Sequence, residues 1–375
     1  MFAVAGVLYC LISLVNHYLF KTYTLDLGLY THAMYDYTHF RIDDCTVFKD
    51  VPRSIISDHF DLYLLLLSPL VNLFGTYTLL IVQIAAVLLG GWGVCKLLRL
   101  YTDDGWLPVL ATATFFLSFG IIQALGYDYH SNVLTAMMLP WLLYFIKRKR
   151  FGLASLFVVL FVIGKENMSL WLFFVVIALM WDYRKDRKTM WHLAAYAVFS
   201  IAYFIVINMV VMPRLGGSGG DFARYAYLGS DYGEVAKYLV THPWEAIKIL
   251  FTNTLGKPNY DGIKTEFYIC ALTTGLVLTL FKPNYLVMLI PLIGAEDVGR
   301  RPYVLGRFAA IFRRVHARVG HRIVFGDSQA EKTMVEVGLG RCLVALYHPD
   351  HFLHDRRAQI VYHGRPVVRL PRAPL

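Results

Sequence analysis

The carboxylates best placed for chemistry stand at the edges of apolar runs near the start of the chain. Asp26 lies in the segment TLDLGLYTHAMYDYTHFR, and Asp58 lies just before the apolar run LYLLLLSPL. A carboxylate at a membrane edge is costly unless it is solvated or used, and such a group can take the proton of an attacking hydroxyl. We therefore predict Asp26 and Asp58 as catalytic residues. The alternative is that they cap helices or lie in a solvated interfacial loop.

A second set of polar residues interrupts the apolar sequence further along. These residues are His59 beside Asp58, Asp128 and His130 in YDYHSN, Lys165 and Glu166 in IGKEN, and Arg224 and Tyr225 in DFARYAYLG. Basic groups of this kind can hold a phosphate leaving group, and aromatic rings can stack on a sugar or lie among lipid headgroups. We predict this set to bind substrate, because titratable groups from separate elements that meet in one place form active sites. The alternative for Lys165 and Glu166 is a self-neutralised pair.

The sequence gives no clear signal for a metal or cofactor. Asp58, His59, Asp128 and His130 have the composition of a divalent-metal site, but their spacing matches no metal motif. We therefore favour a hydrogen-bonded network of His and Asp side chains and predict no metal. The five cysteines are scattered, which indicates neither a disulfide framework nor a zinc site. The run GGSGG at residues 216–220 lacks the lysine of a phosphate-binding loop and is typical of a flexible hinge.

Apolar runs of near-membrane length position these residues. Hydrophobic residues make up 57% of the 375-residue chain, which excludes an ordinary soluble domain. We predict an all-α, polytopic membrane protein with amphipathic helices in its first outer loop, where Leu27, Tyr30, Met34 and Tyr37 recur at helical spacing. The expected spans are 1–20 (retained as a first span), 77–98, 106–125, 133–146, 153–164, 169–181, 193–212 and 267–281, with a shorter helix at 62–74 and a truncated run at 285–293.

The charges of the short loops predict how the spans are oriented. Basic residues cluster at 96–99, 147–150 and 184–188, and the positive-inside rule places these loops in the cytoplasm. The opposite side then receives loop 21–60, residues 127–132, residues 165–167 and the long loop 213–265. Loop 21–60 carries six acidic and four basic residues. This topology gathers the candidate residues at the extracytoplasmic face of the membrane.

Five motifs carry a resemblance to a known family. DLGLY, SDHFDLYLLLLSPL, YDYHSN, GKEN and RYAYLG occur in this order over roughly residues 20–295. In this respect the chain resembles a family of prokaryotic predicted membrane proteins of unknown function. That family is distantly similar to the GT-C glycosyltransferases, polytopic enzymes that use polyprenyl-phosphate sugars and have an acidic residue in the first outer loop. The resemblance implies Asp26 or Asp58 as the catalytic acid or base.

The candidate residues, together with this resemblance, predict a GT-C-like glycosyltransferase in domain 1–293, acting at the extracytoplasmic face of a bacterial or archaeal inner membrane. Its expected partners are membrane lipid and a polyprenyl-phosphate-linked sugar, with no nucleic acid. The first alternative is a transporter or flippase for a lipid-linked or anionic solute, in which Lys165 and Glu166 form a gating or proton-coupled pair. The second is a membrane assembly protein that keeps the fold without the chemistry.

The tail at residues 294–375 differs in composition from the rest of the chain. Residues 299–375 hold 14 basic against 5 acidic residues, whereas residues 1–298 hold 22 against 21. Arginine also replaces lysine there, with 13 Arg and 1 Lys after residue 298. One interpretation is a basic cytoplasmic tail that binds anionic headgroups or nucleic acid. We favour a frame-shifted or disordered tail, because the change coincides with the interruption of a span too short to cross a bilayer.

Overall fold

The computed structural model describes residues 1–41, 54–216, 225–254 and 281–293, with isolated positions between 258 and 272. The chain divides into two compact units, Met1–Ala310 and Ile311–Leu375, and every described residue belongs to the first. The described part consists of helices and their connections, without strands. The predicted all-α fold is therefore confirmed. The predictions for Arg224, for most of span 267–281 and for the tail 294–375 concern residues outside the described part of the chain.

The helices fall into three groups by position in the chain. The first group is α1 (Phe2–Tyr18), α2 (Leu29–Thr38), α3 (Ile55–Asp58), α4 (Leu62–Leu67), α5 (Val71–Phe74) and α6 (Thr78–Leu98). The second is α7 (Leu107–Phe116), α8 (Phe119–Gly126), α9 (Ser131–Ala136), α10 (Leu139–Lys147), α11 (Phe151–Val162) and α12 (Met168–Asp182). The third is α13 (Arg187–Val206), α14 (Met212–Arg214), α15 (Tyr232–Thr241), α16 (Pro243–Phe251) and α18 (Ile290–Ile293).

Several of these helices are suited to a bilayer. Three continuous helical stretches are long and apolar enough to cross one, judged by length and composition: Leu62–Leu98, Leu107–Gly126 and Arg187–Arg214. Shorter apolar helices occur at Phe2–Tyr18, Phe151–Val162 and Met168–Asp182. The predicted helix at 62–74 does lead into the span that follows it, through the short helical turns Ser68–Leu70 and Gly75–Tyr77.

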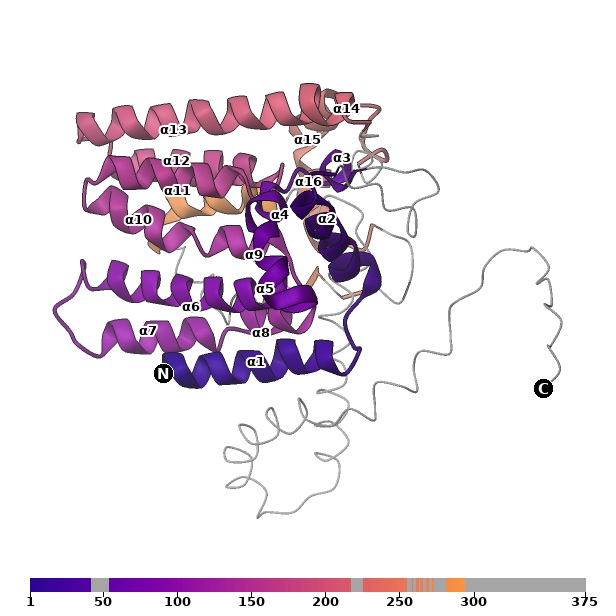
Figure 1. The fold of residues 1–375 in the computed structure, drawn as a ribbon. Coiled ribbons are helices and arrows are strands. Elements are labelled where there is room, and N and C mark those ends of the chain that lie inside the picture. The colour runs from indigo at the N-terminus through magenta and orange to yellow at the C-terminus, as the bar shows by residue number, and fades with distance from the viewer. Residues whose placement is uncertain are drawn as a thin grey trace, which may run out of the picture. The chain divides into compact units, whose positions relative to one another are not determined.

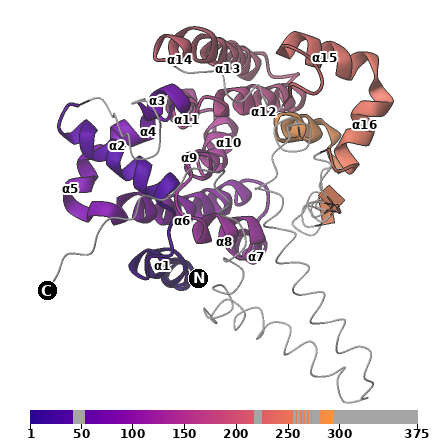
Figure 2. The same cartoon turned by 90° about the vertical axis from the view of Figure 1, so that its right-hand side faces the viewer.

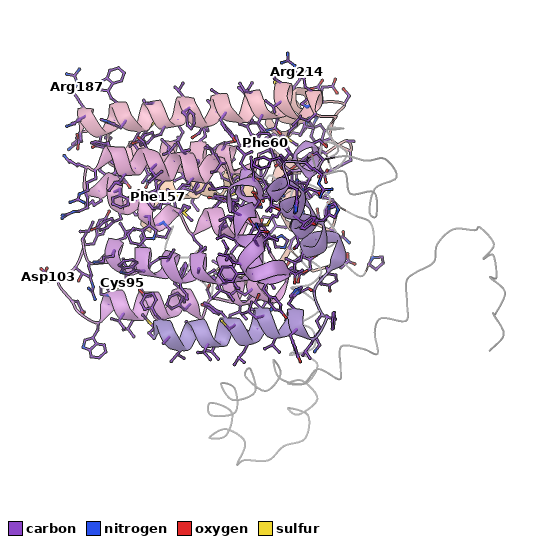
Figure 3. All side chains as sticks on the ribbon, in the orientation of Figure 1. Phe60, Cys95, Asp103, Phe157, Arg187 and Arg214 are labelled. Carbon is purple, nitrogen blue, oxygen red and sulfur yellow. The ribbon has the colours of Figure 1, made fainter. Side chains whose placement is uncertain are left out.

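The long helices lie side by side and α2 lies across one end of them (Figure 1). Figure 2 looks onto that end, and neighbouring helices α1 and α6, α6 and α10, and α12 and α13 are in contact. Figure 3 shows Asp103 and Arg187 at one end of the helices and Phe60 and Arg214 at the other. We call the end with Asp103 and Arg187 the basic end, because it also carries the loops at 147–150 and 184–188. We call the end with Phe60 and α2 the outer end.

Glycines let α6 approach its neighbours closely. A Cβ atom added at Gly91 would lie 2.3 Å from the ring of Phe116 in α7, and one at Gly90 would lie 2.6 Å from Met137 Sδ. Small residues at helix interfaces are typical of membrane helices, where close backbone approach replaces the hydrophobic effect as the source of attraction. The close packing of α6 therefore brings it against Phe116 at the end of α7 and Met137 at the end of α9.

Two large apolar clusters hold the described helices together. The first joins α1, α2, α6 and α8 and includes Met34, Leu80 and Leu125. The second joins α10–α13 and includes Leu142, Leu172 and Leu193. Polar side chains are buried where these clusters meet the outer end, and there the candidate site lies.

Candidate functional site at the outer end

The amphipathic segment of the first loop places Asp26 above the helix ends. Thr24–Gly28 forms a π-helical turn that continues into α2. Leu27 and Met34 are buried, as their spacing predicted, whereas Asp26 is half-buried. The Tyr127 hydroxyl donates a hydrogen bond of 2.8 Å to Asp26 Oδ2. The first loop is thereby joined to the connection between α8 and α9.

That connection, residues 127–130, is held in an unusual backbone conformation. Asp128 is buried and has a φ of 74°, in the left-handed region that aspartate tolerates better than most residues. Its Oδ2 accepts a 2.6 Å bond from the Tyr23 backbone N–H. The buried Gln83 of α6 clamps the connection, donating to the Asp128 carbonyl at 2.7 Å and accepting from the His130 N–H at 2.8 Å. Asp128 thus joins the connection that carries His130 to the first loop.

The turn between α11 and α12 is bonded to the end of the first loop. Glu166 Oε2 accepts a 3.0 Å bond from the Phe60 N–H, and Oε1 lies 3.4 Å from His59 Nδ1, an ion-pair distance whose geometry falls short of a hydrogen bond. The Leu62 N–H donates to the Ile163 carbonyl at 3.0 Å. Burial alone would raise the pKa of Glu166, but His59 and Lys165 favour the charged form and hold that pKa below its ordinary value. Glu166 is therefore a buried anion that docks two distant segments.

Gly164 makes this docking possible. A Cβ atom at this position would lie 1.8 Å from Thr135 Oγ1 and 2.8 Å from Tyr63 Cε2. No larger residue fits between α9 and α4 without moving them. The turn that carries Lys165 and Glu166 consequently lies directly against both helices.

Asp61 is the most deeply buried carboxylate of the outer end. Its side chain is 1% exposed and caps α4, with Oδ1 accepting a 2.9 Å bond from the Tyr63 N–H. Oδ2 is buried without a hydrogen-bond partner. Burial raises the pKa of Asp61 to about 7, although the Tyr63 N–H, the Ser131 side chain and Lys165 act in the opposite direction. Such a carboxyl group exchanges a proton near neutral pH.

Two tyrosines lie between the carboxylates. Tyr129 is fully buried, its hydroxyl has no hydrogen-bond partner, and burial followed by the charge of Asp61 raises its pKa. Tyr30 of α2 packs edge-on against Tyr129, with ring centroids 5.9 Å apart. Burial raises the pKa of Tyr30, and a cluster of carboxylates adds to the effect, namely Asp61, Asp26, Glu166 and Asp58. Tyr30 therefore marks the point where the acidic groups of three separate segments converge.

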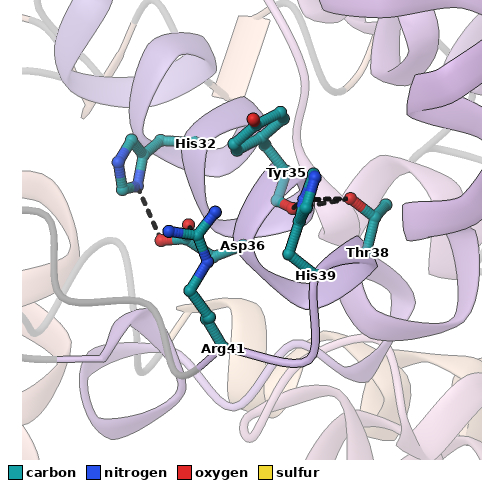
Figure 4. Close-up of polar contacts among 6 residues, drawn as sticks. All are labelled: His32, Tyr35, Asp36, Thr38, His39 and Arg41. Carbon is teal, nitrogen blue, oxygen red and sulfur yellow. Dashed lines mark hydrogen bonds and ion pairs between the residues drawn. The ribbon is translucent and has the colours of Figure 1, made fainter.

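A separate polar contact stabilises the far end of α2. His32 Nδ1 lies 3.4 Å from Asp36 Oδ2, and Arg41 Nε lies 4.0 Å from Asp36 Oδ1. Figure 4 shows both basic side chains reaching the Asp36 carboxylate, while His39 turns toward Thr38. Asp36 is 6% exposed and lies within ion-pair distance of both basic side chains.

The structure brings most of the predicted residues together at the outer end, but these residues differ in how far they are buried. Asp58 is exposed at the end of α3, whereas Lys165 is half-buried and interacts electrostatically with both Asp61 and Glu166. Tyr225 packs against an apolar cluster of Leu228, Val235 and Ile249. Within the described residues, no group of three or more His, Cys, Asp or Glu side chains is arranged to hold a metal ion.

Sequence reasoning missed Asp61, Tyr129, Tyr30, Tyr127 and Gln83 as functional candidates. The signal at Asp61 was that of an ordinary helix N-cap before an apolar run, and the residue does cap α4. The positions of the aromatic residues in the sequence are typical of a membrane interface or of an apolar helix face, so they do not stand out as functional. Their contacts join segments about a hundred residues apart, which a single sequence does not reveal.

Comparison with known proteins places the chain in one family. A family model described as Predicted membrane protein (DUF2079) matches residues 16–301. No curated protein and no solved structure matches the chain.

Proposed function

The chain belongs to the DUF2079 family of predicted membrane proteins, and from this premise we propose that it transfers a sugar from a polyprenyl-phosphate donor at the extracytoplasmic face. The observation that supports the proposal is the convergence at Tyr30, where burial and the charges of Asp61, Asp26, Glu166 and Asp58 raise the pKa of the phenol. Separate loops thus supply acidic groups to one place, beside the basic Lys165. Transfer from a lipid phosphate needs both kinds of group.

The reaction would use these groups in defined roles. The acceptor hydroxyl attacks the anomeric carbon of the sugar, a new C–O bond forms, and the bond to the phosphate oxygen breaks with its electron pair. A carboxylate takes the hydroxyl proton, and a basic group balances the charge that develops on the phosphate. We assign the first role to Asp26, which Tyr127 holds in place, with Asp58 as the alternative, and the second to Lys165.

The remaining residues would bind and orient the substrate. His59 and Glu166 hold the end of the first loop against the Lys165 turn. Asp128 and His130 belong to the connection that Gln83 clamps, and the ring of His130 stacks on Tyr127 with centroids 5.1 Å apart. Arg224 and Tyr225 stay proposed contacts from the long outer loop.

Sugar transfer by the purified protein in proteoliposomes tests the proposal. With a radiolabelled polyprenyl-phosphate sugar as donor, we expect Asp26→Asn to lower turnover by about 10²–10⁴-fold while the lipid still binds. Asp103→Asn, at the basic end (Figure 3), is the matched control and should leave turnover unchanged. Full transfer by both Asp26→Asn and Asp58→Asn would remove these two residues from the mechanism.

A transporter is the second candidate, because Glu166 joins two segments that would have to part in a gate. In that case Glu166→Gln and Lys165→Gln should abolish flux of a lipid-linked or anionic solute. Neither the wild type nor any variant would then transfer sugar. The same proteoliposomes, assayed for solute flux, separate the two functions.

A further inference from the structure

Two buried polar atoms next to the Lys165 turn lack the partners that buried atoms ordinarily have. Asp61 Oδ2 and the Tyr129 hydroxyl both belong to side chains that are 1% exposed or less, and neither makes a hydrogen bond. Native proteins leave few such atoms unpaired, and each calls for an explanation. Neither atom is used by the mechanism proposed above.

Asp61 is surrounded by groups that influence its proton from every side. Its own helix contributes the Tyr63 N–H, the 129–131 connection contributes Tyr129 and Ser131, and α2 contributes Tyr30. The 165–166 turn contributes one cation and one anion, which act on Asp61 in opposite directions. Burial prevails over the groups that favour the ionised form, so Asp61 is near the balance between its neutral and charged states.

A phosphate held by Lys165 would shift that balance. The ammonium of Lys165 interacts with both Asp61 and Glu166, so an anion bound to it lies within electrostatic range of Asp61. The anion also offsets the cation that favours ionised Asp61. Both effects favour the neutral carboxyl group, because like charges at short range in a poorly solvated place repel strongly.

We propose that Asp61 takes up a proton when a phosphate ester binds at Lys165, so that lipid-phosphate binding and proton binding are coupled. The inference rests on the proposed function for the identity of the ligand, a polyprenyl phosphate. No bond of the phosphate breaks in this step: the carboxylate and a proton from water give the neutral acid. Coupling of this kind is reciprocal, so acid must strengthen phosphate binding as much as phosphate strengthens proton binding.

The direction of the pH dependence follows. Below the pKa of Asp61 the proton is already present and binding needs no uptake. Above it, each pH unit weakens phosphate binding by up to about tenfold, until the pKa of the complex is also passed. The neutral amide of Asn mimics the protonated acid and keeps the cap on α4, so Asp61→Asn should bind at high pH as the wild type binds at low pH.

Binding of polyprenyl phosphate to the full-length protein in detergent, measured by calorimetry from pH 5.5 to 8.5, tests the coupling. We expect the wild-type affinity to fall at least tenfold over this range relative to Asp61→Asn, with proton uptake visible as a dependence of the heat on the buffer. The second ionisation of the phosphate, near pH 6, is common to both proteins and cancels in the comparison. Asp61→Ser, which also caps the helix, should behave as Asp61→Asn does, and Lys165→Gln should lose binding at every pH.

The outcomes separate this inference from the proposed function. Binding with the same pH profile in wild type and Asp61→Asn overturns the coupling and leaves the proposed function standing. Undiminished binding by Lys165→Gln overturns the assignment of the phosphate site. Failure of the wild type to bind at any pH overturns the ligand and the coupling together. Equal binding of inorganic phosphate would contradict the lipid as its source.

Discussion

Charged side chains gather at both ends of the long helices, and the two ends hold them differently. At the basic end, Lys149 Nζ lies 2.9 Å from Asp186 Oδ2 and Lys282 Nζ lies 3.7 Å from Asp182 Oδ1, with both lysine side chains 62% exposed. At the outer end, Asp61 and Glu166 are 1% and 6% exposed. Carboxylates thus form partly exposed ion pairs at one end and are almost fully buried at the other.

This difference separates charges that set orientation from charges that can do chemistry. Exposed pairs contribute little to stability, because water and salt screen their charges. Buried carboxylates cost free energy, and a protein keeps them where they dock segments or exchange protons. The comparison therefore predicts large effects for substitutions at the outer end and small ones at the basic end.

The largest loss of stability is expected from Gly164→Ala. The added Cβ collides with Thr135 Oγ1 and the Tyr63 ring, and overpacking of this kind costs about 1–3 kcal/mol or more. We expect a fall of many degrees in the apparent melting temperature in detergent. Gly152→Ala is the matched control, because nothing lies within 4 Å of its Cβ.

A second substitution checks the cause of that loss. Thr135→Ala removes the atom nearest to the new Cβ, so the double variant should recover part of the stability. Equal melting temperatures for Gly164→Ala and Gly152→Ala would instead show that the turn does not lie against α9 and α4.

The next effect concerns Asp61 and pH. Its pKa is about 7 in the folded protein, above the ordinary value of an aspartate, so the folded state binds this proton more tightly than the unfolded chain does. The stability that this contributes is complete in acid and is lost as pH rises to about 7, on the order of 4 kcal/mol. Asp61→Asn lacks this dependence.

Apparent melting temperatures of both proteins from pH 4.5 to 8.5 measure the difference. The melting temperature of Asp61→Asn should rise relative to that of the wild type as pH rises toward 7. Above that pH the difference between the two should stay constant. A difference in melting temperature that is the same at every pH in this range would mean that Asp61 is ionised throughout.

The smallest effect is expected from Asp186→Asn at the basic end. Lys149 and the Thr189 contacts hold the pKa of Asp186 at about 2, but the Lys149 and Asp186 side chains are 62% and 30% exposed, so water screens their charges. We expect an apparent melting temperature close to that of the wild type, and transfer or flux unchanged. A loss comparable with that of the outer-end variants would contradict the distinction between the two ends.

The sequence predicted the local features of the fold well and the long-range ones poorly. Leu27 and Met34 face inward at helical spacing, as expected. The predicted span 133–146 is in fact two helices, α9 and α10, with Pro140 in the first turn of α10. Proline suits a helix start and disrupts a helix interior, so the division has a local cause that the apolar pattern concealed.

The candidate site shows the same limit more strongly. Lys165 and Glu166 had a self-neutralised pair as the alternative interpretation, and the structure adds His59 and the Phe60 N–H as partners of Glu166. The residues in that contact are more than a hundred positions apart in the sequence, and no local sequence pattern predicts it. The expected frame shift in the tail concerns residues outside the described part of the chain, and sequencing the gene across Gly294 decides it.

The proposed function requires the outer end to face away from the cytoplasm. In a cysteine-free background, Tyr35→Cys of α2 and Lys185→Cys of the basic loop supply exposed thiols at opposite ends. A membrane-impermeant maleimide added to intact cells should label Tyr35→Cys at once and Lys185→Cys only after the membrane is permeabilised. Labelling of Lys185→Cys in intact cells, with or without Tyr35→Cys, would contradict the account.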